Sequence, residues 1–217
     1  MIEPTRSVRM IPTPFAESGQ PVRLKLIVHT PPTPGPHPVI VFNHGSTGSG
    51  RLPAQFLHEG DFPNTARFFA QRGWILVAPQ RRGRGGSDGV YDEGFGADRA
   101  AGYSCDPATA CAGRWPERFA GAINFNGGWL GRLCDTHTQV NPAAFLRGVS
   151  FRGPTLWLHG SHDQYYRIAH CRSNFDAFMA AGGQGEFHAL RGGHGLIGKS
   201  LLWHPVVSRF LDQVDAR

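Results

Sequence analysis

The stretch TLWLHGSHDQYY, residues 155–166, begins as a strand and ends in polar residues. Its apolar start is typical of a parallel strand whose two faces are covered by helices. Gly160 ends the apolar run, and Asp163 follows in a short loop. Because functional side chains of open parallel sheets gather at the carboxyl ends of strands, we predict that Asp163 is a catalytic acid. The alternative is that Asp163 caps a helix beginning near Arg167.

A second strand end follows downstream, FHALRGGHG at residues 187–195, and it delivers His194 between glycines. One helix and one strand are expected between Asp163 and His194, which places both side chains at the ends of neighbouring strands. A carboxylate beside a histidine fixes the imidazole tautomer and stabilises its protonated form, as a general base requires. We therefore predict an Asp163–His194 pair. A solvated loop histidine is the alternative interpretation.

A third strand end lies upstream, in VIVFNHGSTGSG at residues 39–50. The glycines permit a sharp turn that leaves backbone N–H groups free, and such groups can stabilise a developing oxyanion. We expect the N–H of Ser46 or Thr47 to serve in this way. The β-branched run that precedes the turn predicts a parallel strand buried on both faces.

The remaining pattern alternates short apolar strands with helices, which predicts an α/β fold with an open, mostly parallel, doubly wound sheet. Residues 22–28 alternate with period two, with Val22, Leu24, Leu26 and Val28 on one face, and predict a strand near the sheet edge. We expect one domain over residues 1–217. Helices are expected in three segments, with these buried residues: 63–73 (Ala66, Phe69, Ala70), 167–181 (Ile168, Phe175, Phe178, Met179) and 204–214 (Val206, Val207, Phe210, Leu211, Val214).

The net charge of +6 comes from 22 Lys and Arg residues against 16 Asp and Glu residues. Part of the excess lies in QRRGRGGSDG, residues 80–89. There is no long basic run and no array of stacking aromatic residues, so we do not expect nucleic-acid binding. His159, His162 and Asp163 are close in sequence, but an extended segment points them in different directions, so we expect no metal site and no cofactor.

The four cysteines are Cys105, Cys111, Cys134 and Cys171, and their spacing matches neither a CxxC pair nor a zinc finger. A local Cys105–Cys111 disulfide is conceivable. The first fifteen residues lack the apolar core of a signal peptide, and no apolar run reaches the ~20 residues that cross a bilayer. We expect a cytoplasmic protein with reduced thiols and no membrane partner.

Four motifs together resemble the α/β-hydrolase superfamily, and more narrowly the esterases and peptidases related to dienelactone hydrolase. They are NHGSTG, GWILVAPQRRGRGGSDG, LHGSHD and GGHG, and the resemblance covers about residues 20–215. It implies hydrolysis of carboxylic esters, lactones or related acyl bonds in a small-molecule substrate, without a cofactor. It also implies that His194 is the base, that Asp163 is its acid, and that Ser46 and Thr47 form the oxyanion hole.

The resemblance is interrupted where the family places its nucleophile, in a G-x-S-x-G turn between a strand and a helix. Only 32 residues separate Asp88 from Gly121, whereas a crossover helix, strand, turn and helix need roughly 50. We therefore predict a fold shortened by about one strand and its flanking helices, with the join between Cys105 and Ala112. Ser104 and Cys105 are weak candidates for the nucleophile.

Two functions are compatible with this pattern. The first is an acyl hydrolase that uses His194 and Asp163. The second is an inactive remnant or binding protein that keeps the pocket but has lost its nucleophile. The retained acid, base and oxyanion loop favour the first, and the absence of a G-x-S-x-G turn between a strand and a helix favours the second.

Overall fold

The structure is a computed structural model, and it describes residues 3–45, 58–91, 119–128 and 151–216. The chain divides into two compact units, Met1–Phe95 and Gly96–Arg217. We describe each unit by itself, and the expectation of a single domain stays a prediction.

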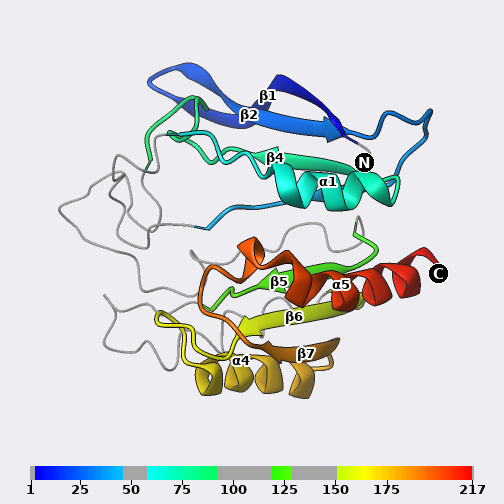
Figure 1. Ribbon diagram of the computed structural model, residues 1–217. Helices are drawn as coiled ribbons and strands as arrows, with labels where there is room; N and C mark the ends of the chain where they lie inside the picture. The colour runs from blue at the N-terminus through cyan, green and yellow to red at the C-terminus, as the bar shows by residue number, and fades with distance from the viewer. Residues whose placement is uncertain (1–2, 46–57, 92–118, 129–150, 217) are drawn as a thin grey trace. The chain divides into compact units, whose positions relative to one another are not determined.

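The N-terminal unit contains a four-stranded sheet with the order β1-β2-β4-β3 (Figure 1). The pairs β1/β2 and β2/β4 are antiparallel, and β3/β4 is parallel. Helix α1 connects β3 to β4, as expected for a crossover between parallel strands. The bounds are β1 Thr5–Glu17, β2 Gln20–Thr30, β3 Val39–Val41, α1 Pro63–Gln71 and β4 Ile75–Pro79.

Helix α1 is confirmed with the predicted buried face, because Ala66, Phe69 and Ala70 are all buried. Phe69 is 1% exposed, and Leu76 of β4 is completely buried. Gly73 follows the helix with φ +76°, a left-handed conformation that glycine adopts without strain. The helix therefore ends where the sequence predicts.

Of the two strand predictions for this unit, the one for residues 22–28 is confirmed by β2, which lies next to the edge strand β1, and the one for β3 is wrong in detail. Strand β3 is predicted to be buried on both faces, but Val39 and Val41 are 53% and 41% exposed. In β2 the residues with complete or near-complete burial after Val22 are Ile27 and His29, on the face opposite Leu26. His29 can be buried on that face because its ring is paired with Asp61.

A chain of charged side chains joins the strands of this unit to the segment before α1. The buried His29 contacts Asp61 with 2.7 Å between Nε2 and Oδ1. Arg6 of β1 donates to both Asp61 and Glu59, at 2.8 and 2.6 Å. Lys25 of β2 also donates to Glu59, and this hydrogen bond is the largest cause of a lowered pKa of that carboxyl. Five residues thus form one connected ionic network.

The C-terminal unit contains a three-stranded parallel sheet with the order β5-β6-β7 (Figure 1). Strand β6 is central, and all seven of its residues are buried. The bounds are β5 Ala122–Phe125, β6 Pro154–Gly160, α4 Ile168–Ala180, β7 Gln184–Leu190, the short 3-10 helix η5 Leu196–Gly198 and α5 Ser200–Asp215. The strands and helices downstream of residue 120 therefore follow the predicted order.

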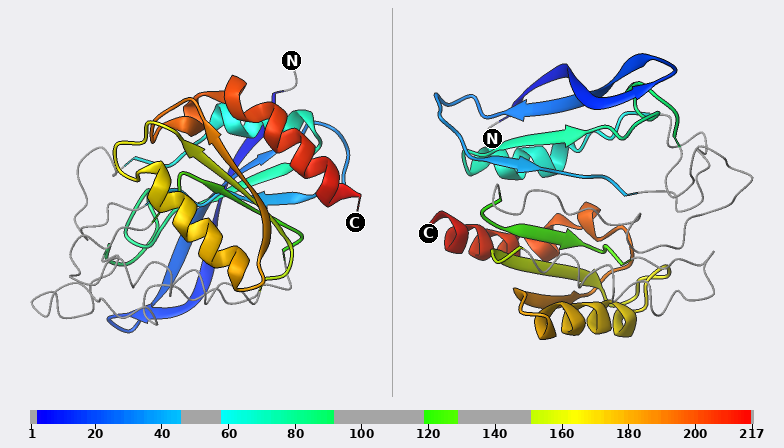
Figure 2. Two further views of the ribbon diagram at one scale, coloured as in Figure 1. Left: turned by 90° about the horizontal axis from the view of Figure 1, so that it is seen from below. Right: turned by 180° about the vertical axis from the view of Figure 1, so that it is seen from behind.

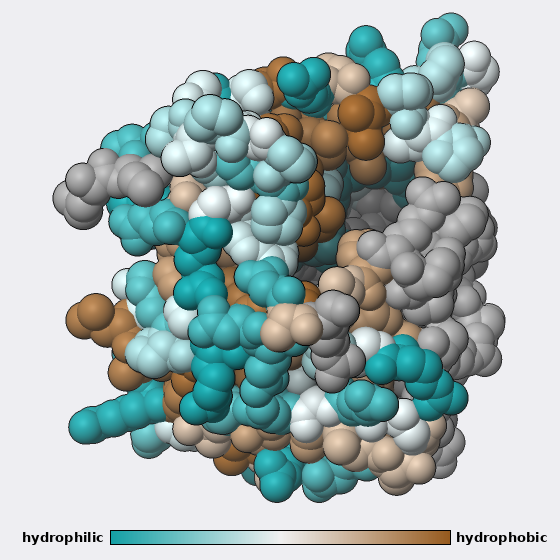
Figure 3. Space-filling model, turned by 90° about the vertical axis from the view of Figure 1, so that its right-hand side faces the viewer, coloured by the Kyte–Doolittle hydropathy of each residue, from teal (hydrophilic) through white to brown (hydrophobic). Residues whose placement is uncertain are grey.

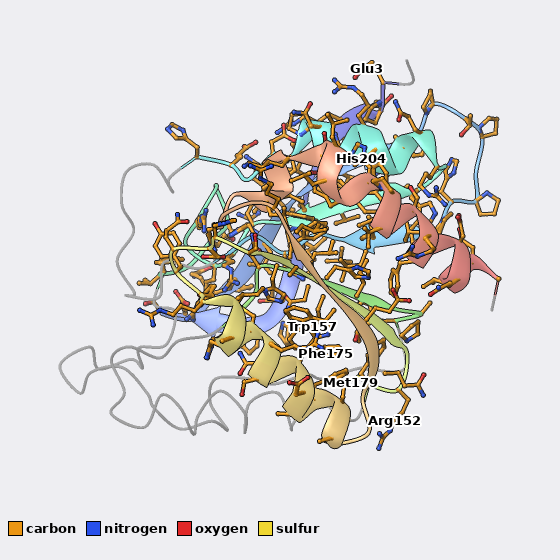
Figure 4. The ribbon with its side chains drawn as sticks, turned by 60° about the horizontal axis from the view of Figure 1, so that its bottom comes forward. Glu3, Arg152, Trp157, Phe175, Met179 and His204 are labelled. Carbon is orange, nitrogen blue, oxygen red and sulfur yellow. The ribbon has the colours of Figure 1, made fainter. Side chains whose placement is uncertain are left out.

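Helices α4 and α5 cover opposite faces of this sheet, as the views in Figure 2 show. On one face, Trp157 of β6 packs against Phe175 and Phe178 of α4. Figure 4 shows Trp157 and Phe175 close together beneath α4. On the other face, Phe125 of β5 packs edge-on against Trp203 of α5 at 5.3 Å between ring centroids. This unit is doubly wound, as predicted.

The predicted buried faces of α4 and α5 are confirmed in part, because Ile168 and Val206, which were predicted to be buried, are only half-buried. In α4 the buried residues include Cys171 and Asn174, whereas the predicted Met179 is 38% exposed because it lies one position beyond the face that Phe175 and Phe178 define. Helix α5 begins at Ser200, four residues before the predicted start, and buries Trp203 in addition to Val207, Phe210, Leu211 and Val214. Pro205 lies inside the helix, where it has no N–H to donate to the carbonyl four residues earlier.

The two sheets are hydrogen-bonded separately within the described ranges, since β3 pairs with β4 and β5 pairs with β6. The predicted join between Cys105 and Ala112 lies outside the described residues.

None of the described helices is long and apolar enough to cross a membrane. On the face shown in Figure 3, hydrophobic residues lie between hydrophilic ones.

Candidate active site

The acid and the histidine predicted from sequence lie together in the C-terminal unit. The loop after β6 carries Asp163 and the loop after β7 carries His194, with 2.9 Å between Asp163 Oδ2 and His194 Nδ1. The strands that precede them are hydrogen-bonded neighbours in a parallel sheet, so both loops leave the same edge. Neighbouring strand ends therefore produce the predicted pair.

Asp163 is held rigidly, because each carboxylate oxygen has its own partners. Oδ2 faces His194, and Oδ1 accepts the backbone N–H groups of Tyr165 and Tyr166 at 2.7 and 3.0 Å. The carboxylate side chain is only 1% exposed. The helix-cap alternative is wrong, since α4 begins two residues after Tyr166 and its capping residue, Arg167, makes no side-chain cap. The aspartate instead closes a local turn.

His194 presents its second ring nitrogen outward. Its side chain is 42% exposed, and within the described part of the chain Nε2 makes no hydrogen bond. Tyr165 lies edge-on to the imidazole at 4.8 Å between ring centroids, and Tyr166 lies at 5.5 Å. With Nδ1 facing a carboxylate, the favoured neutral tautomer leaves Nε2 free to accept a proton.

Among the described residues, no serine or cysteine side chain hydrogen-bonds to His194. Cys171 is a free thiol that is 1% exposed, and burial raises its pKa to about 12. Such a thiol is not an activated nucleophile, because the thiolate is the reactive form. Ser104 and Cys105, the weak candidates from sequence, lie outside the described residues.

The turn after β3 is described only as far as Gly45, so Ser46 and Thr47 lie outside the described residues. The two residues before them are held by arginines of the loop that follows β4. Arg84, which is 8% exposed, donates to the Gly45 carbonyl at 2.9 Å, and Arg81 donates to the His44 carbonyl at 3.2 Å. The arginine-glycine stretch read from sequence as surface charge thus has a structural role.

Asn126, immediately after β5, is a site residue whose role was not predicted from sequence. Its side chain donates to the carbonyl of His194 at 2.6 Å and accepts the N–H of Gly160 at 2.8 Å. It is 4% exposed and has φ +50°. The Asn-Gly-Gly sequence after an apolar strand was the available signal, because asparagine is one of the few residues that tolerates this conformation.

His159 of β6 differs from the other polar residues of this sheet. It is 1% exposed, and neither ring nitrogen has a hydrogen-bond partner among the described residues. Its ring stacks on Phe187 at 5.1 Å between centroids and 11° between planes. Burial lowers its pKa to about 4, so the imidazole is neutral at pH 7. In the described ranges, no group of three or more His, Cys, Asp or Glu residues could hold a metal ion.

The parallel strands, the helices on both faces of the C-terminal sheet, and the acid and histidine after adjacent strands define a shortened α/β-hydrolase fold. No protein-family model and no curated protein sequence matches the chain.

Solved structures of esterases and peptidases share this fold. Thermogutta terrifontis esterase 2 is 18% identical with a TM-score of 0.59, over 96% of this chain and 94% of that one. The Pyrococcus furiosus esterase Pf2001 is 14% identical with a TM-score of 0.56, over 98% of this chain and 90% of that one. The Pyrococcus horikoshii acylaminoacyl peptidase is 15% identical with a TM-score of 0.60, over 96% of this chain but only 41% of that one.

Proposed function

We propose that this protein hydrolyses carboxylic esters, lactones or related acyl bonds of small molecules, with His194 as general base and Asp163 as the acid that orients it. The observation that carries the proposal is the 2.9 Å contact between the buried Asp163 carboxylate and Nδ1 of a histidine whose Nε2 makes no hydrogen bond to any described residue. The fold shared with esterases and peptidases supports it.

The proposed reaction uses the pair in two steps. Nε2 of His194 takes the proton of a hydroxyl or thiol as that group attacks the acyl carbon, and Asp163 stabilises the imidazolium that results. His194 then returns the proton to the leaving group, and water hydrolyses the acyl intermediate by the same route. Ser104 or Cys105 is the proposed attacking residue.

We propose that the backbone N–H groups of Ser46 and Thr47 stabilise the oxyanion. The hydrogen bond from Arg84 to the Gly45 carbonyl supports this role. A carbonyl and the amide that follows it share one peptide plane, so a bond that holds the first restricts the second. One such donor is worth about 3 to 4 kcal/mol in an acyl-transfer transition state.

An inactive binding protein is the second candidate, and one observation favours it. Within the described residues His194 has no serine or cysteine partner, and the G-x-S-x-G match in the sequence, residues 85–89, lies in the loop after β4, where Ser87 Oγ donates to the Gln80 carbonyl. A protein of this kind would retain the Asp163–His194 pair as a relic and bind acyl compounds without turnover.

Hydrolysis of short-chain p-nitrophenyl esters separates the two candidates. We expect turnover by the wild type, its loss in His194→Ala, and its retention in His188→Ala, a matched control because His188 lies on β7 but contacts Glu186 instead of Asp163. Equal rates for wild type and His194→Ala would reject the hydrolase and leave the binding protein.

A fluorophosphonate probe with peptide mapping identifies the nucleophile. The Thermogutta terrifontis esterase 2 is described as phosphoramylated by tabun and as phosphorylated by paraoxon, so organophosphorus reagents suit a protein of this fold. We expect a label at Ser104 or Cys105 that disappears in His194→Ala. A label elsewhere would reassign the nucleophile, and the absence of any label would favour the binding protein.

A further inference from the structure

We propose that Asn126 is a positioning residue that sets the orientation of the His194 imidazole by holding the backbone on which it is carried. The inference rests on the proposed role of His194 as a base. It is carried by hydrogen bonds that converge from the ends of three parallel strands, β5, β6 and β7.

The Asn126 amide is fully satisfied in only one orientation. Its Nδ2 donates to the carbonyls of His194 and Gly193 at 2.6 and 3.2 Å, and its Oδ1 accepts the N–H of Gly160 at 2.8 Å. Rotating the amide by 180° would put oxygen against two carbonyls and nitrogen against an N–H. The donor end of Asn126 is therefore directed at the histidine loop and the acceptor end at the acid loop.

The backbone at this junction leaves little freedom. Asn126 is itself held at the end of β5, since its N–H donates to the Leu158 carbonyl at 2.9 Å. At Gly160 an added Cβ would lie 2.5 Å from the carbonyl oxygens of both Gly192 and Gly193. The N–H of His162 also donates to the Gly192 carbonyl at 2.8 Å. The acid loop and the histidine loop therefore touch backbone to backbone, with Asn126 bridging them.

His194 is thus anchored at two points. Asp163 holds the ring through Nδ1, and Asn126 holds the main chain of the same residue through its carbonyl oxygen. A ring that is tethered only by Asp163 could follow movements of the glycine-flanked loop. With both anchors, the direction of Nε2 is fixed relative to the sheet, as a general base in a positioned site requires.

Asn126→Asp and Asn126→Gly test the proposal, because both residues tolerate a positive φ and both remove the two donors. The matched control is Asn124→Asp, two residues earlier in β5, since among the described residues the side chain of Asn124 bonds only to Gly127. The first measurement is the ¹⁵N spectrum of the His194 imidazole in the full chain, which reports tautomer populations and does not require activity. The second is kcat and KM for p-nitrophenyl ester hydrolysis.

We expect Asn126→Asp and Asn126→Gly to reduce the population of the His194 tautomer protonated at Nδ1, and to lower kcat by about 10- to 100-fold with KM changed less than threefold. Asn124→Asp should match the wild type in both measurements. If the Gly and Asp variants change the spectrum and kcat alike, the effect comes from loss of the donors, because only the Asp variant adds a charge. An unchanged His194 spectrum in either folded variant would overturn the proposal.

Absence of hydrolysis in every variant, including wild type, would reject the proposed function but not the positioning role, which the spectrum tests alone. If Asn126→Asp does not fold, Asn126→Gly decides. If neither folds, the serine replacement Asn126→Ser, which keeps one donor, is measured in the same way. Failure of all three to fold, while Asn124→Asp folds, would assign Asn126 to stability and overturn the proposal.

Discussion

His194 follows β7 and His159 lies in the neighbouring strand β6, but the two histidines differ in their hydrogen-bond partners and in their exposure. His194, after β7, has a buried carboxylate on one nitrogen and leaves the other exposed. His159, inside β6, is sealed between aromatic rings and has no hydrogen-bond partner in the described part of the chain. The polar side chains at the strand ends are thus hydrogen-bonded, whereas His159 within β6 has no hydrogen-bond partner among the described residues. The backbone of adjacent loops supplies partners to the polar side chains at the strand ends, and no described residue supplies one to His159.

The most severe way to break the hydrogen-bond network at the strand ends is Asp163→Asn. The amide no longer fixes the tautomer of His194 or stabilises its charge, so we expect kcat to fall by about 10³- to 10⁴-fold. Ester hydrolysis measures the loss, and circular dichroism checks that the chain is folded. Asp176→Asn is the matched control, because Asp176 is an exposed residue of α4 paired with Arg172. A kcat within threefold of wild type would contradict the assigned role of Asp163.

Gly160→Ala should disrupt the same network through the backbone. Its Cβ would meet two carbonyl oxygens at 2.5 Å, and because neither belongs to a flexible side chain, the loops must separate. We expect a loss of about 2 to 3 kcal/mol in the free energy of unfolding. Denaturant unfolding provides the measurement. Gly195→Ala is the control, since an added Cβ there has no neighbour within 4 Å; a similar loss in both variants would refute the explanation by close approach.

The substitution His159→Leu should increase the free energy of unfolding, in contrast to the substitutions at the strand ends. Leucine replaces two buried nitrogens without partners by an apolar side chain of similar size, so we expect a gain of about 1 to 2 kcal/mol at pH 7. Urea unfolding of wild type and variant gives the difference. A loss of stability would mean that the imidazole has a partner of its own.

The same variant should also change the dependence of stability on pH. The folded-state pKa of His159, about 4, lies below its ordinary value of 6.5, so the unfolded chain takes up a proton first as the pH falls. Its contribution is complete above pH 6.5 and is lost as the pH falls toward 4, by at most about 3 kcal/mol. We therefore expect the free energy of unfolding of His159→Leu, relative to that of the wild type, to rise as the pH falls from 6.5 toward 4. Unfolding series at pH 7 and pH 4.5 measure it.

The smallest expected effect concerns Cys171, a buried residue of α4. Burial raises the pKa of this thiol to about 12, so only about one molecule in 10⁴ carries the thiolate at pH 8. We expect iodoacetamide to leave Cys171 unmodified in the native protein and to modify it after unfolding, with the sites identified by mass spectrometry. Rapid native labelling at this residue would show that α4 opens readily.

The sequence predicted the C-terminal unit well because its signals are local. Strand β6 is a continuous apolar run, and glycines mark the exits that carry Asp163 and His194. Strand β1 was not predicted, because Pro12 and Pro14 interrupt its pattern and its register shifts between Pro12 and Ala16. The burial of Ile27 and His29 on one face of β2 was not predicted, because the burial of His29 depends on Asp61, which is distant in sequence.

The site shows the same division between local and distant information. The pairing of Asp163 with His194 follows from the order of strands, so the sequence was sufficient. The bridging role of Asn126 depends on carbonyl groups about 67 residues away, which no local pattern reveals. The isolation of His159 is equally hidden, because a histidine at the end of an apolar strand usually suggests a polar partner.

The ionic network of the N-terminal unit has a practical consequence. Arg6 holds β1 to Glu59 and Asp61, and its side chain is 39% exposed. Dissolved salt screens exposed charges over about 10 Å at 0.1 M, so the contribution of the Arg6 ion pairs weakens as ionic strength rises, while the backbone pairing of β1 with β2 remains. The contribution of these ion pairs to the stability of the protein therefore depends on the salt content of the buffer. Stabilities and rates of its variants are comparable only when they are measured at one fixed ionic strength.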